Sequence, residues 1–105
     1  MRHRPWLGLV LGLSVYATAA EARPLRVMSL DQCADQYVLN LAPAATLALS
    51  PRADDEDSWS RGLVGSQAML RPTLETALAF QPDVVVRYWG GEPRLFRALE
   101  RRGVK

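Results

Sequence analysis

Residues 82–91, PDVVVRYWGG, place an arginine and two aromatic residues directly after a run of valines and before two glycines. Arg87 can form charge-assisted hydrogen bonds to an anion, and Tyr88 and Trp89 offer flat ring faces with a polar edge. The two glycines permit backbone conformations that allow close approach of another group. This combination predicts a binding loop for a bulky, ring-bearing ligand. The alternative is that one ring packs against the helix that follows.

Other residue types that could perform chemistry give weaker signals. The only histidine, His3, lies in the amino-terminal segment, so the rest of the chain offers no Ser-His or Cys-His pair. Cys33, the single cysteine, is expected to be a small buried residue and has no partner for an internal disulfide. The acidic run at residues 54–57 lacks the spacing of a calcium loop and is expected to be a solvated surface. We therefore expect no metal site and no catalytic residue.

The elements that must position the binding loop alternate between strands and helices. Strands are expected at residues 25–30, 46–50, 63–66 and 83–86. Helices are expected after the N-cap residue Asp31 as far as Pro43, after the N-cap residue Thr73 as far as Pro82, and over residues 93–102. The apolar positions expected to face the core of the first helix are Ala34, Tyr37, Val38 and Leu41, and those of the second are Leu74, Ala77 and Leu78. Gly103 is placed to cap the last helix, and Val104 is expected to begin another strand.

This alternation predicts an α/β fold with a mainly parallel sheet flanked by helices. The unbroken valines of residues 84–86 suit a strand buried on both faces. In such sheets ligands bind beyond the carboxyl ends of the strands, here loops 29–32, 50–59, 65–70 and 87–92. The ligand-binding residues predicted on this basis are Arg87, Tyr88, Trp89, Gly90, Gly91, Ser29, Asp31 and Gln32.

The first 22 residues have the composition of a secretory signal peptide, with basic residues, a short apolar run at residues 7–15 and an Ala20-Glu21-Ala22 cleavage pattern. The run is too short for a bilayer span, which needs about 20 residues. Removal of 22 residues from the 105-residue chain leaves 83, with 11 basic and 10 acidic side chains. This near-neutral balance predicts neither nucleic-acid binding nor a polybasic membrane patch.

The segments RVMSLDQCADQYVLNLA, LALSP and LETALAFQPDVVVRYWGG resemble the amino-terminal lobe of periplasmic substrate-binding proteins of ABC importers. The type resembled takes up iron-siderophores, haem or vitamin B12. The resemblance covers nearly all of residues 25–105, and the βα pattern that breaks off at residue 104 is typical of part of a two-lobed protein. It implies a periplasmic monomer, without a cofactor of its own, that carries a metal chelate or corrinoid to an ABC permease in the inner membrane.

The resemblance also implies roles for individual residues. Tyr88 falls where vitamin B12-binding members have a tryptophan in the cleft, which makes Tyr88 a ligand-stacking candidate. Glu75 falls on the acidic residue with which such proteins dock onto arginines of the permease, although stabilisation of the helix dipole is a sufficient structural role. Arg87 and Trp89 depart from the vitamin B12-binding pattern, and Arg87 suits an anionic ligand such as a ferric siderophore or a haem propionate.

Two other classes of function remain open on the residues alone. A secreted α/β enzyme or chelatase-like domain would need its catalytic residues in a further part of the protein. A sensor or partner-binding module would need an appended signalling or transmembrane segment. The sequence beyond residue 105 would discriminate among the three.

Overall fold

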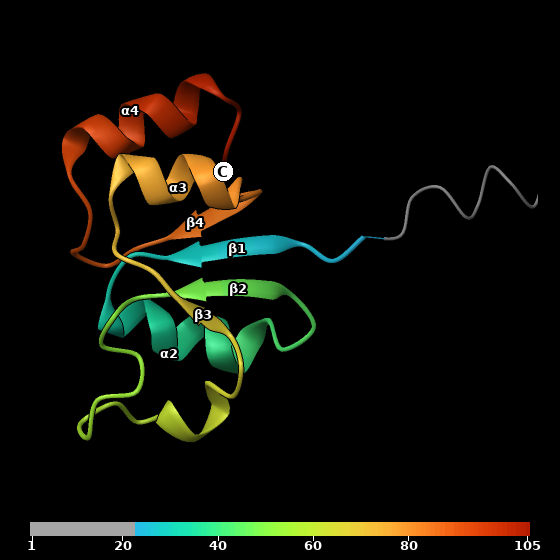
Figure 1. Ribbon diagram of the computed structural model, residues 1–105, viewed down its shortest axis with the longest axis vertical. Helices are drawn as coiled ribbons and strands as arrows, with labels where there is room; N and C mark the ends of the chain where they lie inside the picture. The colour runs from blue at the N-terminus through green and yellow to red at the C-terminus, as the bar shows by residue number, and fades with distance from the viewer. Residues whose placement is uncertain (1–22) are drawn as a thin grey trace, which may run out of the picture.

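The computed structural model describes residues 23–105, so the predicted signal peptide lies outside the described part of the chain. The elements in chain order are β1 (Arg26–Ser29), α2 (Gln32–Leu41), β2 (Thr46–Leu49), the 3-10 turn η1 (Arg61–Leu63), β3 (Ala68–Met69), α3 (Leu74–Phe80), β4 (Val84–Val86) and α4 (Pro93–Arg101). The strands form one parallel sheet in the order β3-β2-β1-β4 (Figure 1). The predicted α/β fold with a parallel sheet flanked by helices is therefore confirmed.

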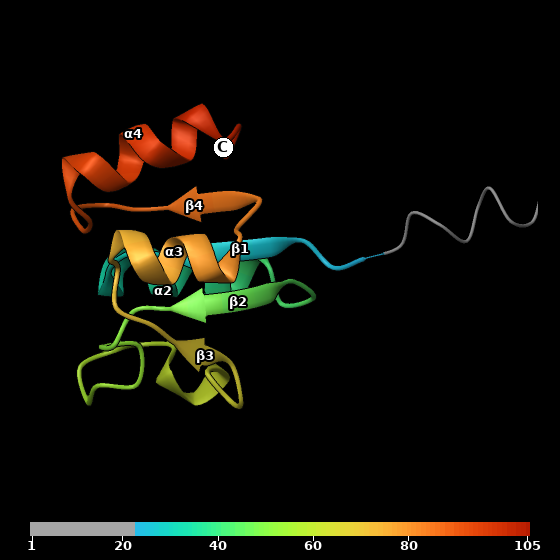
Figure 2. The ribbon, with the colours of Figure 1, turned by 45° about the horizontal axis from the view of Figure 1, so that its top comes forward.

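The sheet separates two hydrophobic cores, because successive strand residues point to opposite faces. On one face Val27, Leu47 and Leu49 pack with α2, and on the other Met28 and Ala48 pack with α3 and α4. Figure 2 shows α3 and α4 on the same side of the strands, with α2 behind them. The result is a three-layer arrangement in which the carboxyl ends of all four strands meet at one edge.

The buried face of α2 differs from the expectation. Ala34 and Val38 are buried as predicted, but Tyr37 and Leu41 are 59% and 78% exposed. Asp35 is fully buried instead, because its carboxylate accepts hydrogen bonds from the backbone amide and the hydroxyl of Ser50. A polar side chain whose hydrogen-bond partners are supplied can occupy a core position. The buried face of α2 is therefore rotated toward Asp35 and Leu39 and away from Tyr37 and Leu41.

Cys33 is also exposed, which contradicts the expected burial. It is the second residue of α2, and it lies on the same outward side as Tyr37 and Asn40. The same phase of the helix that buries Asp35 therefore turns Cys33 toward solvent.

The third strand was placed wrongly by the sequence. Residues 61–63 form η1, and the two-residue strand β3 begins only at Ala68. The loop that leaves its carboxyl end is consequently 70–73, not 65–70. A two-residue strand has too little periodicity to be found from its sequence.

Strand β4 lies at the edge of the sheet, and all three of its valines are only partly buried. Burial on both faces was expected and is not observed, because α2 lies under β1 and β2 and leaves the flank of β4 open. Val104 and Lys105 form no strand, but the backbone of Lys105 accepts from Val85 and donates to Asp83 at distances of 2.8 and 3.3 Å. These residues therefore begin to pair with the outer side of β4.

The helix ends predicted from capping residues, glycine and proline are confirmed. Thr73 caps α3 through a reciprocal pair of bonds with Thr76, and Gly103 follows α4 with a positive φ of 79°. The last residue of α3 is Phe80; its C-cap residue Gln81 adopts the left-handed conformation, and Pro82 follows. Within residues 23–105, no helix has the length and apolar character needed to cross a membrane.

Candidate functional site

The loop after β4 places Tyr88 and Trp89 at the surface. Their exposed fractions are 73% and 56%, so neither ring is buried against α4, which answers the alternative raised by the sequence. Large aromatic side chains are usually buried to a greater extent than this. The loop therefore presents two ring systems to solvent at the carboxyl edge of the sheet.

The backbone of this loop is held by the side chain of Asp31. One carboxylate oxygen accepts three backbone amides, those of Tyr88, Trp89 and Gly90, at 2.7, 2.9 and 2.8 Å. The other oxygen accepts the amide of Ala34 at 2.8 Å and so caps α2. A single carboxylate thus fixes the loop that follows β4 to the helix that follows β1.

The electrostatics of Asp31 follow from these contacts. Burial acts to raise the pKa of the carboxyl, but the four backbone hydrogen bonds outweigh it and hold the pKa below its ordinary value. The carboxylate is therefore charged at neutral pH and fully engaged by the chain. Asp31 was predicted as a ligand contact, but at 1% exposure it supports the loop and does not face a ligand.

Ser29 has a similar position. Its side chain is completely buried and its hydroxyl donates to the backbone oxygen of Asp31 at 3.1 Å. The structure therefore places Ser29 beneath the candidate site, where it orders the turn that carries Asp31.

Gly90 and Gly91 are required by packing within the protein. A β-carbon on Gly90 would lie 2.2 Å from the backbone oxygen of Leu30. Gly91 has a φ of 87°, and a β-carbon there would lie 2.8 Å from the side chain of Leu30 and 3.0 Å from that of Phe96. The close approach that the glycines permit is thus to the chain itself, and it holds the two rings outward.

Arg87 turns toward α4. Its Nε donates to the backbone oxygen of Gly90 at 2.9 Å, and its guanidinium lies 4.2 Å from the ring centroid of Phe96. The side chain is exposed, and among the described residues its Nη atoms form no hydrogen bond. The arginine therefore stabilises the loop through Nε and leaves its charge at the surface on the side of α4.

The loop after β2 is fixed to the other flank of α2. Gln32 donates to the backbone oxygen of Arg52 at 3.3 Å and to the carboxylate of Asp57 at 3.0 Å. Gln36 bonds both Ser58 and Ser60, and Asn40 also bonds Ser60. Residue 59 lies between these two anchored serines, and Trp59 is 95% exposed.

We call the carboxyl edge of the sheet, with the loops that follow β2 (residues 50–60) and β4 (residues 87–92), the rim. A shallow groove of about 410 Å³ in the rim joins Tyr88 to the outer face of α2. It is lined by Cys33, Gln36, Tyr37 and Tyr88. The sequence did not single out Tyr37 or Gln36 for this surface. Tyr37 was predicted to be buried because only hydrophobicity was considered. The hydrogen-bonding capacity of Asp35, which Ser50 satisfies in the core, was the signal for the other orientation of the helix.

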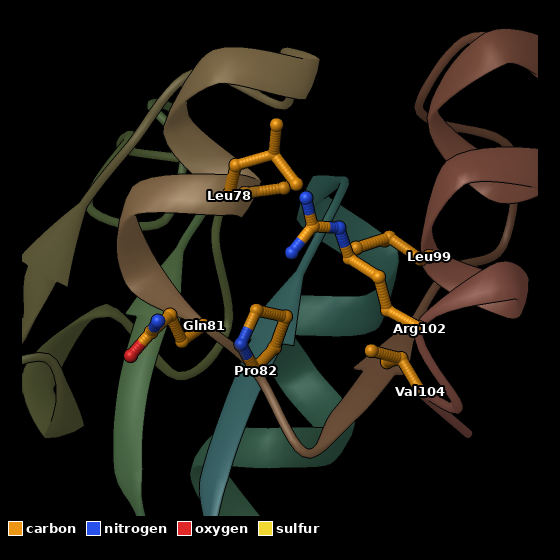
Figure 3. Close-up of a pocket in the computed structure, with 7 residues that line it drawn as sticks. Leu78, Gln81, Pro82, Leu99, Arg102 and Val104 are labelled. Atoms are coloured by element: carbon orange, nitrogen blue, oxygen red, sulfur yellow. The ribbon is translucent and has the colours of Figure 1, made fainter.

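A second hollow lies at the opposite edge of the sheet, between the carboxyl-terminal ends of α3 and α4 (Figure 3). It is lined by Ala77, Leu78, Gln81, Pro82, Leu99, Arg102 and Val104. Its volume of about 170 Å³ is below that of typical small-molecule sites, which span about 300–1,000 Å³. The hollow also contains none of the aromatic residues of the rim, so we do not assign it to ligand binding.

Glu75 is exposed in the first turn of α3, on the other face of the sheet from α2. Its position suits the helix dipole, and it is separate from the rings of the rim. In residues 23–105, no group of three or more metal-ligating side chains is assembled.

Comparisons of this chain with protein-family models, with characterised proteins and with solved structures return no match.

Proposed function

We propose that the chain forms the amino-terminal lobe of the periplasmic solute-binding component of an ABC importer. The ligand is an iron-siderophore, a haem or a cobalamin-type corrinoid, and the protein performs no covalent chemistry. The observation that carries this proposal is the exposure of Tyr88 and Trp89 on a loop that Asp31 fixes at the carboxyl edge of a parallel sheet. Ligands of open α/β sheets bind at this edge.

The rigid presentation of the rings supports stacking against a large flat ligand. Three charge-assisted hydrogen bonds and the packing of Gly90 on Leu30 fix the backbone, so little ordering entropy remains to be lost on binding. Aromatic faces contribute a large contact area with a polar edge. Both features favour a ring-bearing chelate over a small polar solute.

The openness of the rim supports a two-lobed protein. The groove beside Tyr88 is shallow and lies at the surface of the lobe. Tight sites bury most of the surface of their ligand. A second lobe closing over Tyr88 and Trp89 would supply the opposite wall, as in the proteins that the sequence resembles.

The remaining parts of the proposal concern delivery. Residues 1–22 direct export and are removed, and the mature protein acts as a monomer in the periplasm. Exposed Glu75 at the start of α3 docks onto arginines of the inner-membrane permease, where an unburied carboxylate can pair with a cationic side chain. Arg87 adds positive charge beside the rings for an anionic ligand.

Equilibrium dialysis of the full-length, two-lobed protein against hemin, ferrichrome and cyanocobalamin tests the ligand proposal. All three probes are coloured, so the bound amount can be read from their own absorbance. We expect one of them to bind with a dissociation constant in the micromolar range, and Trp89→Ala to weaken that binding about tenfold, as for a central aromatic contact.

Leu63→Ala is the control, because it removes an exposed large apolar side chain from η1, outside the loops at the carboxyl ends of the strands. It should leave binding unchanged. Absence of binding by all three probes, or equal losses in the two variants, would contradict the proposal.

A further inference from the structure

The solvent face of α4 carries an unusual concentration of arginine. Residues 92–105 contain five basic and two acidic side chains, a net charge of +3. All seven are exposed: Arg94, Arg97, Arg101, Arg102, Lys105, Glu92 and Glu100. Such a concentration is not visible in the total charge of the chain, in which basic and acidic residues nearly balance.

Three of the arginines form a straight ridge. Arg94, Arg97 and Arg101 are spaced i, i+3 and i+7, so they lie on one stripe about 10 Å long at 1.5 Å of rise per residue. The opposite side of the helix carries the buried residues Leu95 and Leu99. The ridge therefore points away from the core along the whole length of α4.

The ridge is poorly neutralised within the described residues. The one ion pair found for it joins Arg94 to Glu92 at 3.9 Å, and both side chains are largely exposed. Like charges three and four residues apart disfavour a helix. Arg102 is turned differently, with its guanidinium over the hollow between Leu78 and Leu99 (Figure 3). A surface that keeps such repulsion is suited to an external anionic partner.

The compensating acids lie elsewhere in the molecule. Residues 54–57 are all acidic and belong to the loop between β2 and η1, which Gln32 and Arg52 fix beside α2. Figure 1 shows α4 and this loop at opposite ends of the sheet. The fold thus converts a nearly neutral chain into one with a basic end and an acidic end.

We propose that the ridge Arg94, Arg97 and Arg101 is a docking surface for an anionic lipid bilayer. Protein interfaces combine arginine with an apolar or aromatic centre. The solvent face of α4 has arginine along its centre but no exposed large apolar side chain that could form such a centre. A bilayer of anionic lipids binds basic side chains by charge alone and needs no matching pocket. This inference goes beyond the ligand proposal and does not depend on it.

Co-sedimentation of the protein with vesicles tests this assignment. We compare vesicles of phosphatidylcholine with vesicles that contain a third of phosphatidylglycerol, at 0.1 M and 0.5 M salt. Binding is expected to the anionic vesicles and to weaken at the higher salt, where charge is screened over shorter distances. The double variant Arg97→Gln, Arg101→Gln should bind about 25-fold more weakly, at about fivefold for each arginine removed.

The double variant Arg61→Gln, Arg71→Gln is the matched control. Both of these arginines are exposed and lie outside α4, so the change in total charge is the same. It should retain most of the binding, and any apolar contribution of residues 1–22 is common to all variants. Circular dichroism checks that each variant is folded.

Three results would overturn the proposal. They are absence of binding to anionic vesicles, equal binding to phosphatidylcholine, and equal losses in the two double variants. A duplex oligonucleotide is included as a soluble polyanion, and binding of it at least as tight as binding to anionic vesicles would also overturn the assignment to lipid. Hemin, ferrichrome and cyanocobalamin are absent from these experiments, so their outcome is independent of the ligand test.

Discussion

The two loops that form the rim are attached to α2 in different ways. The loop after β4 depends on one buried carboxylate, that of Asp31, which accepts three of its backbone amides. The loop after β2 depends on Asp35 at its start and on the amides of Gln32, Gln36 and Asn40 along its length. The bonds of Gln36 and Asn40 to serines join neutral groups, and the bond of Gln32 goes to the exposed carboxylate of Asp57.

The two loops should therefore differ in how they lose their structure. Hydrogen bonds to a buried charge are stronger than those between neutral groups, and a lost partner leaves several amides unsatisfied at once. The loop that carries Tyr88 and Trp89 should therefore be lost as a unit. The loop that carries Trp59 should loosen one bond at a time. Four measurements test whether the two loops differ in this way.

Substitution of Gly90 by alanine should have the largest effect. The new β-carbon would lie 2.2 Å from the backbone oxygen of Leu30, so the loop or β1 must shift. We expect a loss of about 3 kcal/mol in the free energy of unfolding, the upper end of overpacking costs. Urea denaturation measures this loss. Gly62→Ala is the control, since nothing lies within 4 Å of its β-carbon, and a similar loss in both variants would contradict the prediction.

Asp31→Asn should be the next most damaging. Whichever way the new amide is turned, its NH₂ group faces backbone amides that also donate. We expect a loss of about 2 kcal/mol, because bonds to a buried charge are removed. Asp35→Asn should cost about 1 kcal/mol or less, since the hydroxyl of Ser50 can accept where it formerly donated. Equal losses by urea denaturation would mean that the two loops do not differ.

The pH dependence of stability gives a third test. The pKa of Asp31 is lower in the folded protein than in the unfolded chain, so its contribution is present above the unfolded pKa and is lost as pH falls through the folded pKa. The wild-type protein should therefore lose more stability than Asp31→Asn between about pH 5 and pH 2. The pKa of Asp83 is also lowered, chiefly by the hydrogen bond from Arg23, but this group is common to both proteins. Parallel curves of unfolding free energy against pH would refute the role given to Asp31.

The smallest effect is expected for Gln36→Ala. Its side-chain oxygen accepts the amide of Ser60 at 2.8 Å, and loss of this bond should cost about 1 kcal/mol locally. The amide of Ser60 should then exchange with solvent about fivefold faster, while the amides of Tyr88 and Trp89 keep their protection. Hydrogen exchange by NMR resolves these positions. Faster exchange at Tyr88 would show that the two loops are coupled.

Much of the fold could be predicted from local signals. The N-caps Asp31 and Thr73, the ends of α3 and α4, and the outward direction of Tyr88 and Trp89 all follow from residue type and spacing. The strand β3 could not be found, because two residues are too few to show the alternation of apolar and polar side chains that identifies a strand. The edge position of β4 could not be found either, since strand order depends on pairing between segments that are distant in the sequence.

The candidate site divides in the same way. Its loop could be located from the sequence, but four of its predicted contacts have other roles in the structure. Asp31 and Ser29 are buried beneath the rim, and Gly90 and Gly91 pack on Leu30. The roles of Arg87, Tyr88, Trp89, Gln32 and Glu75 in binding and docking stay predictions. A polar residue at a strand end can face a ligand or hold a loop, and only its partners distinguish these cases.

The order of the strands and helices, apart from β3, and most of the points at which they begin and end could be read from the sequence alone. These depend on caps, turns and apolar runs that act within a few residues. Three features required the folded structure: Asp35 and not Tyr37 enters the core, Asp31 binds a loop 57 residues away, and the arginines of α4 lie far from the acids of residues 54–57. Each of these outcomes depends on contacts between distant segments, and such contacts do not exist until the sheet has brought the segments together.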